Sequence, residues 1–149
     1  MKSIDVFVRH WATKHVGVPI ASDDIAALEN QLSIYLPTAY KYLLSRFGLL
    51  HSPNVLTKTC HLNVAIAEVQ DFLSLDDVSA LSRLYEMSGM PKGHILFASD
   101  AKGNMFCFNK KDCEKQQQDI PVYYYNHDLH TIESASASFI QWLEQFNEL

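Results

Sequence analysis

The sequence lacks the features that would place it in a membrane, in a fibrous assembly or among disordered chains. No apolar run approaches the roughly 18 residues of a membrane-spanning helix, and the longest uninterrupted stretches, such as residues 95–98, have the length of a strand. Only 5 glycines and 5 prolines occur among 149 residues, which excludes collagen-like and low-complexity chains. A hydrophobic content of 48% and a charged content of 19% indicate one folded domain.

Cysteine is scarce, and no secretion signal is visible. Residues 1–10 contain no apolar core of a signal peptide. Three cysteines cannot all pair with one another, so we expect free thiols and a cytoplasmic, reducing location. Cys60 and Cys107 lie in apolar runs and are predicted to pack as small hydrophobic side chains. Cys113 is predicted to be exposed, with acidic neighbours that raise the pKa of its thiol.

Positive charge is missing from the last quarter of the sequence. Residues 1–115 hold all 12 Lys and Arg together with 12 of the 17 acids, so the net charge of −5 belongs to residues 116–149. This distribution offers no basic patch for a nucleic acid. An acidic surface either suits a basic protein partner or only keeps the protein in solution. The partner-binding candidates are Asp119, Asp128, Glu133 and Glu144.

Hydrophobic periodicity predicts two helices in the first third of the chain. The first is expected from an N-cap at Ser22 to a stop near Ser33. The second is expected to open at Pro37 and to end at Gly48, because proline suits the first helical position and glycine the left-handed stop. The apolar stripe of this second helix predicts burial of Tyr40, Leu44 and Phe47.

The middle of the chain is less clearly patterned. Residues 55–61 have β character, whereas residues 64–75 fit either a helix or a strand. A helix is expected to begin at a cap, Ser74 or Asp76, and to end near residue 89. Its apolar stripe consists of Val78, Leu81, Leu84 and Tyr85.

Residues 94–98 and 105–108 predict a β-hairpin. The structural residues of its turn are Asp100, Gly103 and Asn104, types that tolerate positive φ.

The end of the chain predicts a polar, mobile loop, a strand and a helix. The loop is expected over residues 109–119 and the strand over residues 121–125, in which Tyr123 and Tyr125 share one face and Tyr124 takes the other. The last helix is expected after a cap at Ser134 or Ser136, with a stripe of Phe139, Trp142, Leu143 and Phe146. Clustered strands without regular alternation with helices indicate an α+β domain with a mainly antiparallel or mixed sheet and packed helices.

No pattern of catalytic or metal-binding residues stands out. Glycine-rich phosphate loops and a Gly-x-Ser-x-Gly elbow are absent. His127 and His130 are the best metal candidates, but a turn explains them more simply and further ligands are missing, so we expect no metal and no cofactor. A cysteine–histidine pair could form in space. Each cysteine nevertheless has a structural interpretation, and we expect no enzyme.

Three segments resemble, in order and spacing, the SUKH superfamily of Smi/Knr-like domains. Residues 25–29 and 36–48 resemble the opening helices of that superfamily. Residues 95–104 resemble its central hairpin, and residues 121–123 and 138–143 resemble its closing strand and helix. The resemblance covers about residues 22–146 and divides the chain into an N-terminal lead, 1–21, and a Smi/Knr-like domain, 22–149.

The resemblance implies a single α+β domain without catalysis, and a strand within residues 64–75. It also implies a cytoplasmic immunity protein that binds and neutralises a cognate bacterial toxin, often a nuclease and therefore basic. The alternative is an intracellular interaction adaptor of the same fold with no toxin partner. No nucleic acid or membrane is expected as a partner. The matching residues are mostly fold positions, so the resemblance transfers no binding residue.

Overall fold

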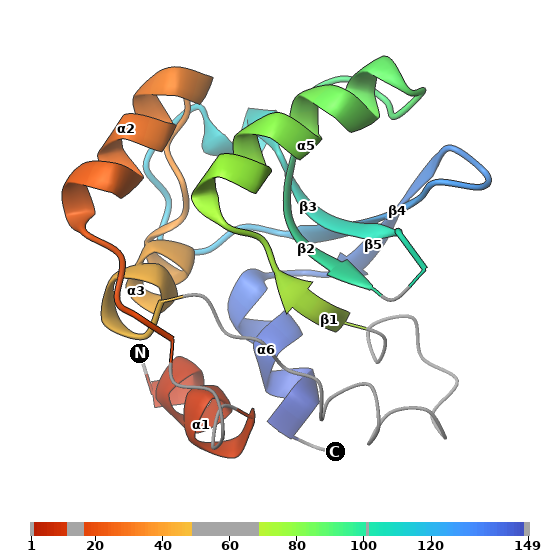
Figure 1. Ribbon diagram of the computed structural model, residues 1–149. Helices are drawn as coiled ribbons and strands as arrows, with labels where there is room; N and C mark the ends of the chain where they lie inside the picture. Colours follow the sequence, from red (N-terminus) through yellow and green to blue (C-terminus); the bar gives the residue numbers. More distant parts are fainter. Residues whose placement is uncertain (1, 12–16, 49–68, 101, 148–149) are drawn as a thin grey trace.

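A five-stranded antiparallel sheet with helices on both faces organises the protein (Figure 1). The computed structural model describes residues 2–11, 17–48, 69–100 and 102–147. The elements within these ranges are α1 (Lys2–Trp11), α2 (Ser22–Leu32), α3 (Thr38–Arg46), β1 (Val69–Phe72), α5 (Leu75–Met87), β2 (His94–Asp100), β3 (Met105–Asn109), the 3-10 helix η2 (Lys110–Cys113), β4 (Val122–Asn126), β5 (Thr131–Ser136) and α6 (Phe139–Asn147).

The sheet is a meander in which each strand pairs with the next one along the chain. Its order is β1-β2-β3-β4-β5, and all four neighbouring pairs are antiparallel. The predicted α+β class and the predicted hairpin of residues 94–98 with 105–108 are confirmed. The strand expected within residues 64–75 is present as β1. The β-like residues 55–61 and Cys60 lie outside the described residues.

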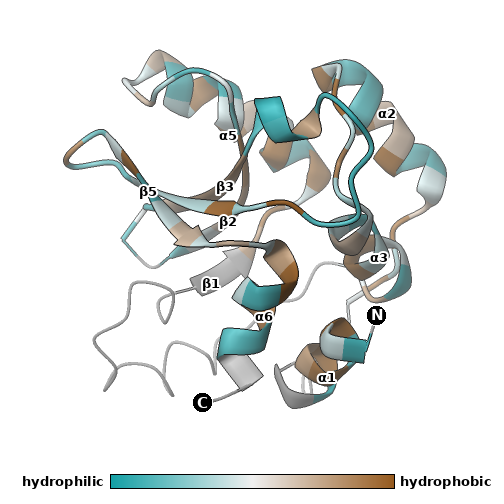
Figure 2. Ribbon diagram, turned by 180° about the vertical axis from the view of Figure 1, so that it is seen from behind, coloured by the Kyte–Doolittle hydropathy of each residue, from teal (hydrophilic) through white to brown (hydrophobic). Residues whose placement is uncertain are grey.

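Helices cover both faces of this sheet. Helix α5 lies on one face and α6 on the other, as the two opposite views show (Figures 1 and 2). Strand β2 is accordingly buried along nearly its whole length. On the α6 face, Phe97 stacks on Phe108 with ring centroids 4.2 Å apart and meets Trp142 edge-on at 5.3 Å. Tyr40 of α3 joins this cluster, 5.4 Å from the ring of Phe108.

The N-terminal helix α1 belongs to the same core. Ile4 and Phe7 are buried, and the Phe7 ring lies 6.2 Å from that of Phe72 in β1. The Ser3 hydroxyl donates to Glu144 Oε1 of α6 at 2.7 Å. Residues 2–9 of the lead therefore help to build the hydrophobic core, although their own pattern is weak.

The end of α3 and the start of α5 lie where the sequence predicted them, whereas the burial of two apolar stripes differs from the prediction. Gly48 has φ 81° and closes α3 by donating to the carbonyls of Leu43 and Leu44. The Ser74 hydroxyl caps α5 by accepting from the Asp77 N–H. Phe47, however, is only half-buried, because it lies one residue beyond α3 and packs on Tyr42. The expected burial of Phe47 is wrong.

The other stripe that differs is that of α5. Val78 is buried in it, whereas Leu84 is 52% exposed. Besides Val78, the buried residue of this helix is the polar Ser82. Its hydroxyl donates to the Val78 carbonyl and accepts from the Leu96 N–H, where the β2–β3 register is irregular.

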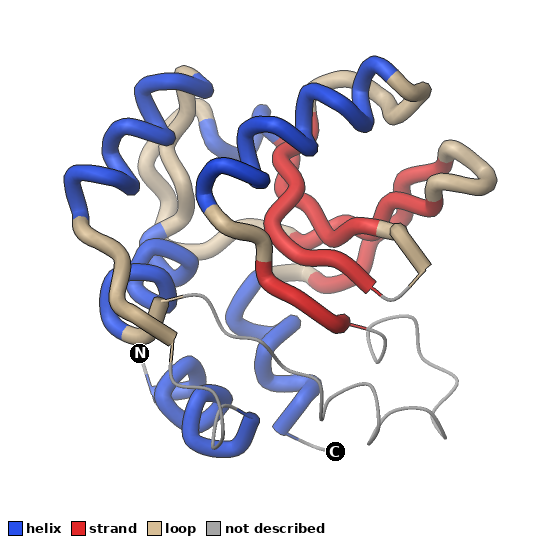
Figure 3. The backbone as a smooth tube through the Cα atoms, viewed as in Figure 1, coloured by secondary structure: helices blue, strands red, loops and turns tan. Residues whose placement is uncertain are grey.

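The polar segment after β3 is tied to the helices, contrary to the expectation of a mobile loop. It begins with η2 and then runs past α3 (Figure 3). Thr38 and Ala39 at the start of α3 donate their N–H groups to the carbonyls of Gln117 and Gln118, each at 2.9 Å. Cys113 is fully buried at the end of η2. The predicted exposure of Cys113 is therefore wrong, because the 3-10 turn directs it into the core.

The end of the chain contains a strand that the sequence did not predict. Residues 131–136 form β5, so Ser134 and Ser136 are strand residues and cannot cap α6. Ser138 takes that position, with its hydroxyl accepting from the Gln141 N–H at 3.1 Å. The opposite faces predicted for Tyr124 and Tyr125 are confirmed: Tyr124 contacts Phe106, whose ring also meets Trp142 of α6. Tyr125 contacts Tyr85 of α5.

Candidate partner-binding surface

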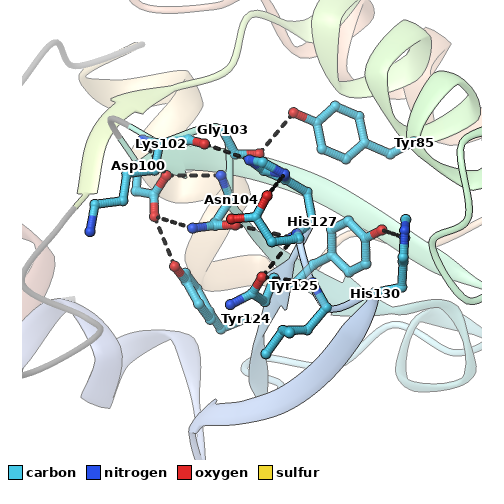
Figure 4. Close-up of polar contacts among 12 residues, drawn as sticks. Tyr85, Asp100, Lys102, Gly103, Asn104, Tyr124, Tyr125, His127 and His130 are labelled. Atoms are coloured by element: carbon cyan, nitrogen blue, oxygen red, sulfur yellow. Dashed lines mark hydrogen bonds and ion pairs between the residues drawn. The ribbon is translucent and has the colours of Figure 1, made fainter.

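A buried carboxylate organises the turn between β2 and β3. Asp100 is 5% exposed, and its Oδ1 accepts from the N–H groups of Lys102 and Asn104, both at 2.8 Å. Its Oδ2 accepts from Asn104 Nδ2 at 3.1 Å and from the Tyr124 hydroxyl at 2.8 Å (Figure 4). Gly103 has φ 83°, a conformation that side chains with a Cβ rarely adopt. One carboxylate thus holds the turn closed and joins it to β4.

The same turn is bonded to the turn between β4 and β5. Asn104 Oδ1 accepts from the His127 N–H at 3.0 Å, and His127 Nε2 donates to the Lys102 carbonyl at 2.6 Å (Figure 4). Helix α5 joins through the Tyr85 hydroxyl, which donates to the Gly103 carbonyl at 2.9 Å. Burial, and then the nearby Asp100 carboxylate, raise the pKa of Tyr85, so its hydroxyl keeps the proton that it donates. Two turns and a helix form one network.

Residues 127–130 form a closed turn. Asn126 Oδ1 accepts from the N–H groups of Asp128 and Leu129 at 3.0 and 3.1 Å. His130 adopts φ 55°, and its Nδ1 lies 3.0 Å from the Tyr125 hydroxyl. Within the described ranges no group of three His, Cys, Asp or Glu side chains could hold a metal ion.

The outer side of this β4–β5 hairpin presents both charge and an apolar side chain. The Asp128 side chain is 79% exposed, and its Oδ1 lies 3.2 Å from His127 Nδ1. Leu129 beside it is 67% exposed. Glu133 is exposed on β5, which is an edge strand of the sheet. We call Asp128, Leu129 and Glu133 the hairpin surface.

The other two acids that the sequence singled out have bonding roles elsewhere. Asp119 lies at the beginning of α6, where its Oδ1 accepts from the N–H of Phe139 at 2.8 Å and its two oxygens lie 3.3–3.4 Å from the N–H of Ile140. A carboxylate at this position satisfies free N–H groups and suits the helix dipole. Glu144 accepts the Ser3 hydroxyl and so joins α6 to α1. Asp128 and Glu133 thus belong to one β-hairpin, whereas Asp119 and Glu144 lie outside it.

Sequence reasoning missed Leu129 and the bonding role of Asp119. Asp119 precedes Phe139 by 20 residues, and no local pattern connects a loop carboxylate to so distant a helix start. Leu129 carried a weak signal, since it is a large apolar residue between polar ones in an expected turn.

The described thiols are not suited to nucleophilic chemistry. Cys107 and Cys113 are both buried. Burial raises the pKa of each to about 12, and for Cys113 the nearby Asp112 and Glu29 carboxylates add to the effect. The thiolate is the reactive form, so neither thiol is activated near neutral pH.

Comparison with known proteins identifies the family. Residues 19–145 match the model of the SMI1 / KNR4 family (SUKH-1), and the chain belongs to this family. No curated protein matches the chain. Helix α1 lies before the matched residues, although it contributes to the core. None of the helices in the described part combines the length and hydropathy required to span a bilayer.

Proposed function

We propose that this protein is a non-enzymatic, cytoplasmic immunity protein that binds and neutralises a cognate bacterial toxin of the polymorphic or contact-dependent type. Membership of a family known for immunity proteins supports the proposal. The observation that carries it is the hairpin surface, where Asp128 and Leu129 are exposed on a turn that internal hydrogen bonds hold in place and Glu133 is exposed on the adjoining strand β5.

This surface has the properties of a binding site for a basic protein. Exposed carboxylates attract a positively charged partner and accelerate its association, and a nuclease toxin needs positive charge to bind phosphates. Leu129 supplies apolar area next to the charges. Because the network of Asp100, Asn104 and His127 already orders the turn, little conformational entropy is lost on binding.

The test measures binding to the product of the gene next to this protein's own, which the proposal expects to be the toxin. Asp128→Asn and Glu133→Gln together should slow association roughly threefold to tenfold at low salt and flatten its salt dependence. Leu129→Ser should mainly accelerate dissociation. Glu114→Gln, at an exposed carboxylate after η2, is the matched control and should bind like the unchanged protein.

Two results would contradict parts of the proposal. Unchanged association of the double variant would place the interface elsewhere on the molecule. Absence of any complex with the neighbouring gene product would favour an intracellular interaction adaptor of the same fold, the alternative function.

A further inference from the structure

A hollow of about 400 Å³ lies among α2, α5, the beginning of β2 and the start of η2. Figure 1 shows how α2, α5 and β2 are arranged. Three cationic residues line it: Arg83 of α5, Lys92 just before β2, and Lys110 at the start of η2. Glu86 is the one carboxylate among its lining residues. The three cations and this single acid leave a local excess of positive charge in a protein with net charge −5.

These three cations are not neutralised by the protein itself. Among the described residues, none of Arg83, Lys92 and Lys110 forms an ion pair or a side-chain hydrogen bond. Lys41, by contrast, is paired with Glu29 at 3.3 Å. Like charges around one hollow repel each other unless an anion lies between them. The arrangement therefore favours binding of a negatively charged ligand.

The segments that carry the cations are fixed relative to one another. The Ser82 hydroxyl, next to Arg83, accepts the Leu96 N–H at 2.9 Å and so joins α5 to β2. The Lys110 N–H donates to the Gly93 carbonyl at 2.8 Å, which joins η2 to the segment that carries Lys92. The backbone segments that carry the three cations are thus held in place before any ligand arrives, so that binding would order only the side chains themselves.

We propose that this hollow binds a small diphosphate-bearing ligand. The guanidinium of Arg83 presents a planar fork suited to two phosphate oxygens, and the ammonium groups of Lys92 and Lys110 act as point charges. Three positive charges against Glu86 match the two to three negative charges of a diphosphate better than the single charge of a carboxylate. The volume lies at the lower end of the range for small-molecule sites.

The experiment uses inorganic pyrophosphate as the probe and needs no protein partner, so its outcome is independent of the proposed immunity function. Amide NMR spectra of the full chain are recorded during a titration at constant ionic strength, balanced with sodium chloride. We expect saturable, one-to-one shifts confined to the amides of residues 83, 92–95 and 110. The double variant Arg83→Gln, Lys110→Gln should weaken binding at least tenfold, and Lys110→Gln alone should weaken it less.

Lys111→Gln is the matched control, because Lys111 is exposed, adjacent to Lys110 and outside the hollow. It should bind pyrophosphate like the unchanged protein. A response that rises linearly, or that is equal in all variants, would overturn the proposal, since it would show only nonspecific screening of surface lysines. Equal affinity for citrate would overturn the assignment to phosphate, because the hollow would then respond to charge alone.

Discussion

Removal of the Asp100 carboxylate is the most informative single change in this fold. In Asp100→Ala, four donors lose their acceptor at once: the N–H of Lys102, the N–H and Nδ2 of Asn104, and the Tyr124 hydroxyl. The change leaves the chain direction of the turn intact, because Gly103 keeps its positive φ. Its effect therefore reports on the hydrogen bonds themselves.

The expected loss of stability follows from how many of these donors are buried. The Lys102 N–H is only partly buried, and water can replace the carboxylate there. The three donors of Asn104 and Tyr124 make buried bonds. A buried donor without an acceptor costs about 1–3 kcal/mol. Because water can enter part of the space left by the carboxylate, we expect Asp100→Ala to lower the free energy of unfolding by about 3–5 kcal/mol in total.

Urea unfolding followed by circular dichroism measures this loss, with the m-value as a check that the unfolded state is unchanged. Asp100→Asn is the conservative comparison. It keeps Oδ1 and its two backbone bonds but sets an amide donor against Asn104 Nδ2, so it should cost about 1–3 kcal/mol. Tyr124→Phe removes the hydroxyl that donates to Asp100 Oδ2 and should cost about 1–2 kcal/mol. A loss below about 1 kcal/mol for Asp100→Ala would refute this account of the turn.

Further predictions concern the core, α6 and the thiols. Phe7→Ala should lower the free energy of unfolding by about 3–4 kcal/mol, although Phe7 lies before the family-matched residues; unchanged stability would separate α1 from the core. Phe47→Ala should cost about half as much in the same assay, because the ring is half-exposed. Asp119→Ala should lower the free energy of unfolding by about 1–2 kcal/mol, because the N-terminus of α6 loses its acceptor. Unchanged stability would show that Asp119 does not stabilise this helix end. Because burial raises the pKa of Cys107 from 9.0 to about 12, the unfolded state loses the proton first as pH rises. The free energy of unfolding should therefore fall between pH 9 and 12, by up to about 1.4 kcal/mol per pH unit for this thiol. In Cys107→Ala the free energy of unfolding should fall less steeply over the same range.

The elements predicted correctly are those whose signal is local. The positions of α2 and α3, the serine cap of α5 and the hairpin turn around Gly103 all depend on residues within a few positions of one another. Strand β5 has no such signal. Its segment, residues 131–136, is mostly polar, and its conformation is set by pairing with β4, from Thr131 opposite Asn126 to Ser136 opposite Val122.

The errors at Cys113 and in the loop around it have one physical cause. A polar composition predicts exposure only if the backbone has no buried partner to bond. Here the carbonyls of Cys113, Gln117 and Gln118 accept the N–H groups of Tyr35, Thr38 and Ala39. Those N–H groups, at and just before the start of α3, need acceptors from somewhere, and the acceptors come from a segment about 80 residues away.

Long-range hydrogen bonds also determine which acidic residues of the last quarter of the chain have a structural role and which are available to a partner. Net charge gives the field around a protein but not the position of any carboxylate within it. Asp119 and Glu144 each accept hydrogen bonds within the fold, so part of their capacity to accept bonds from a partner is already used. Asp128 and Glu133 accept no hydrogen bond from the described residues, Asp128 having only its contact with His127. The second pair is therefore the more available to a partner, and it is also the pair that the structure places on one hairpin.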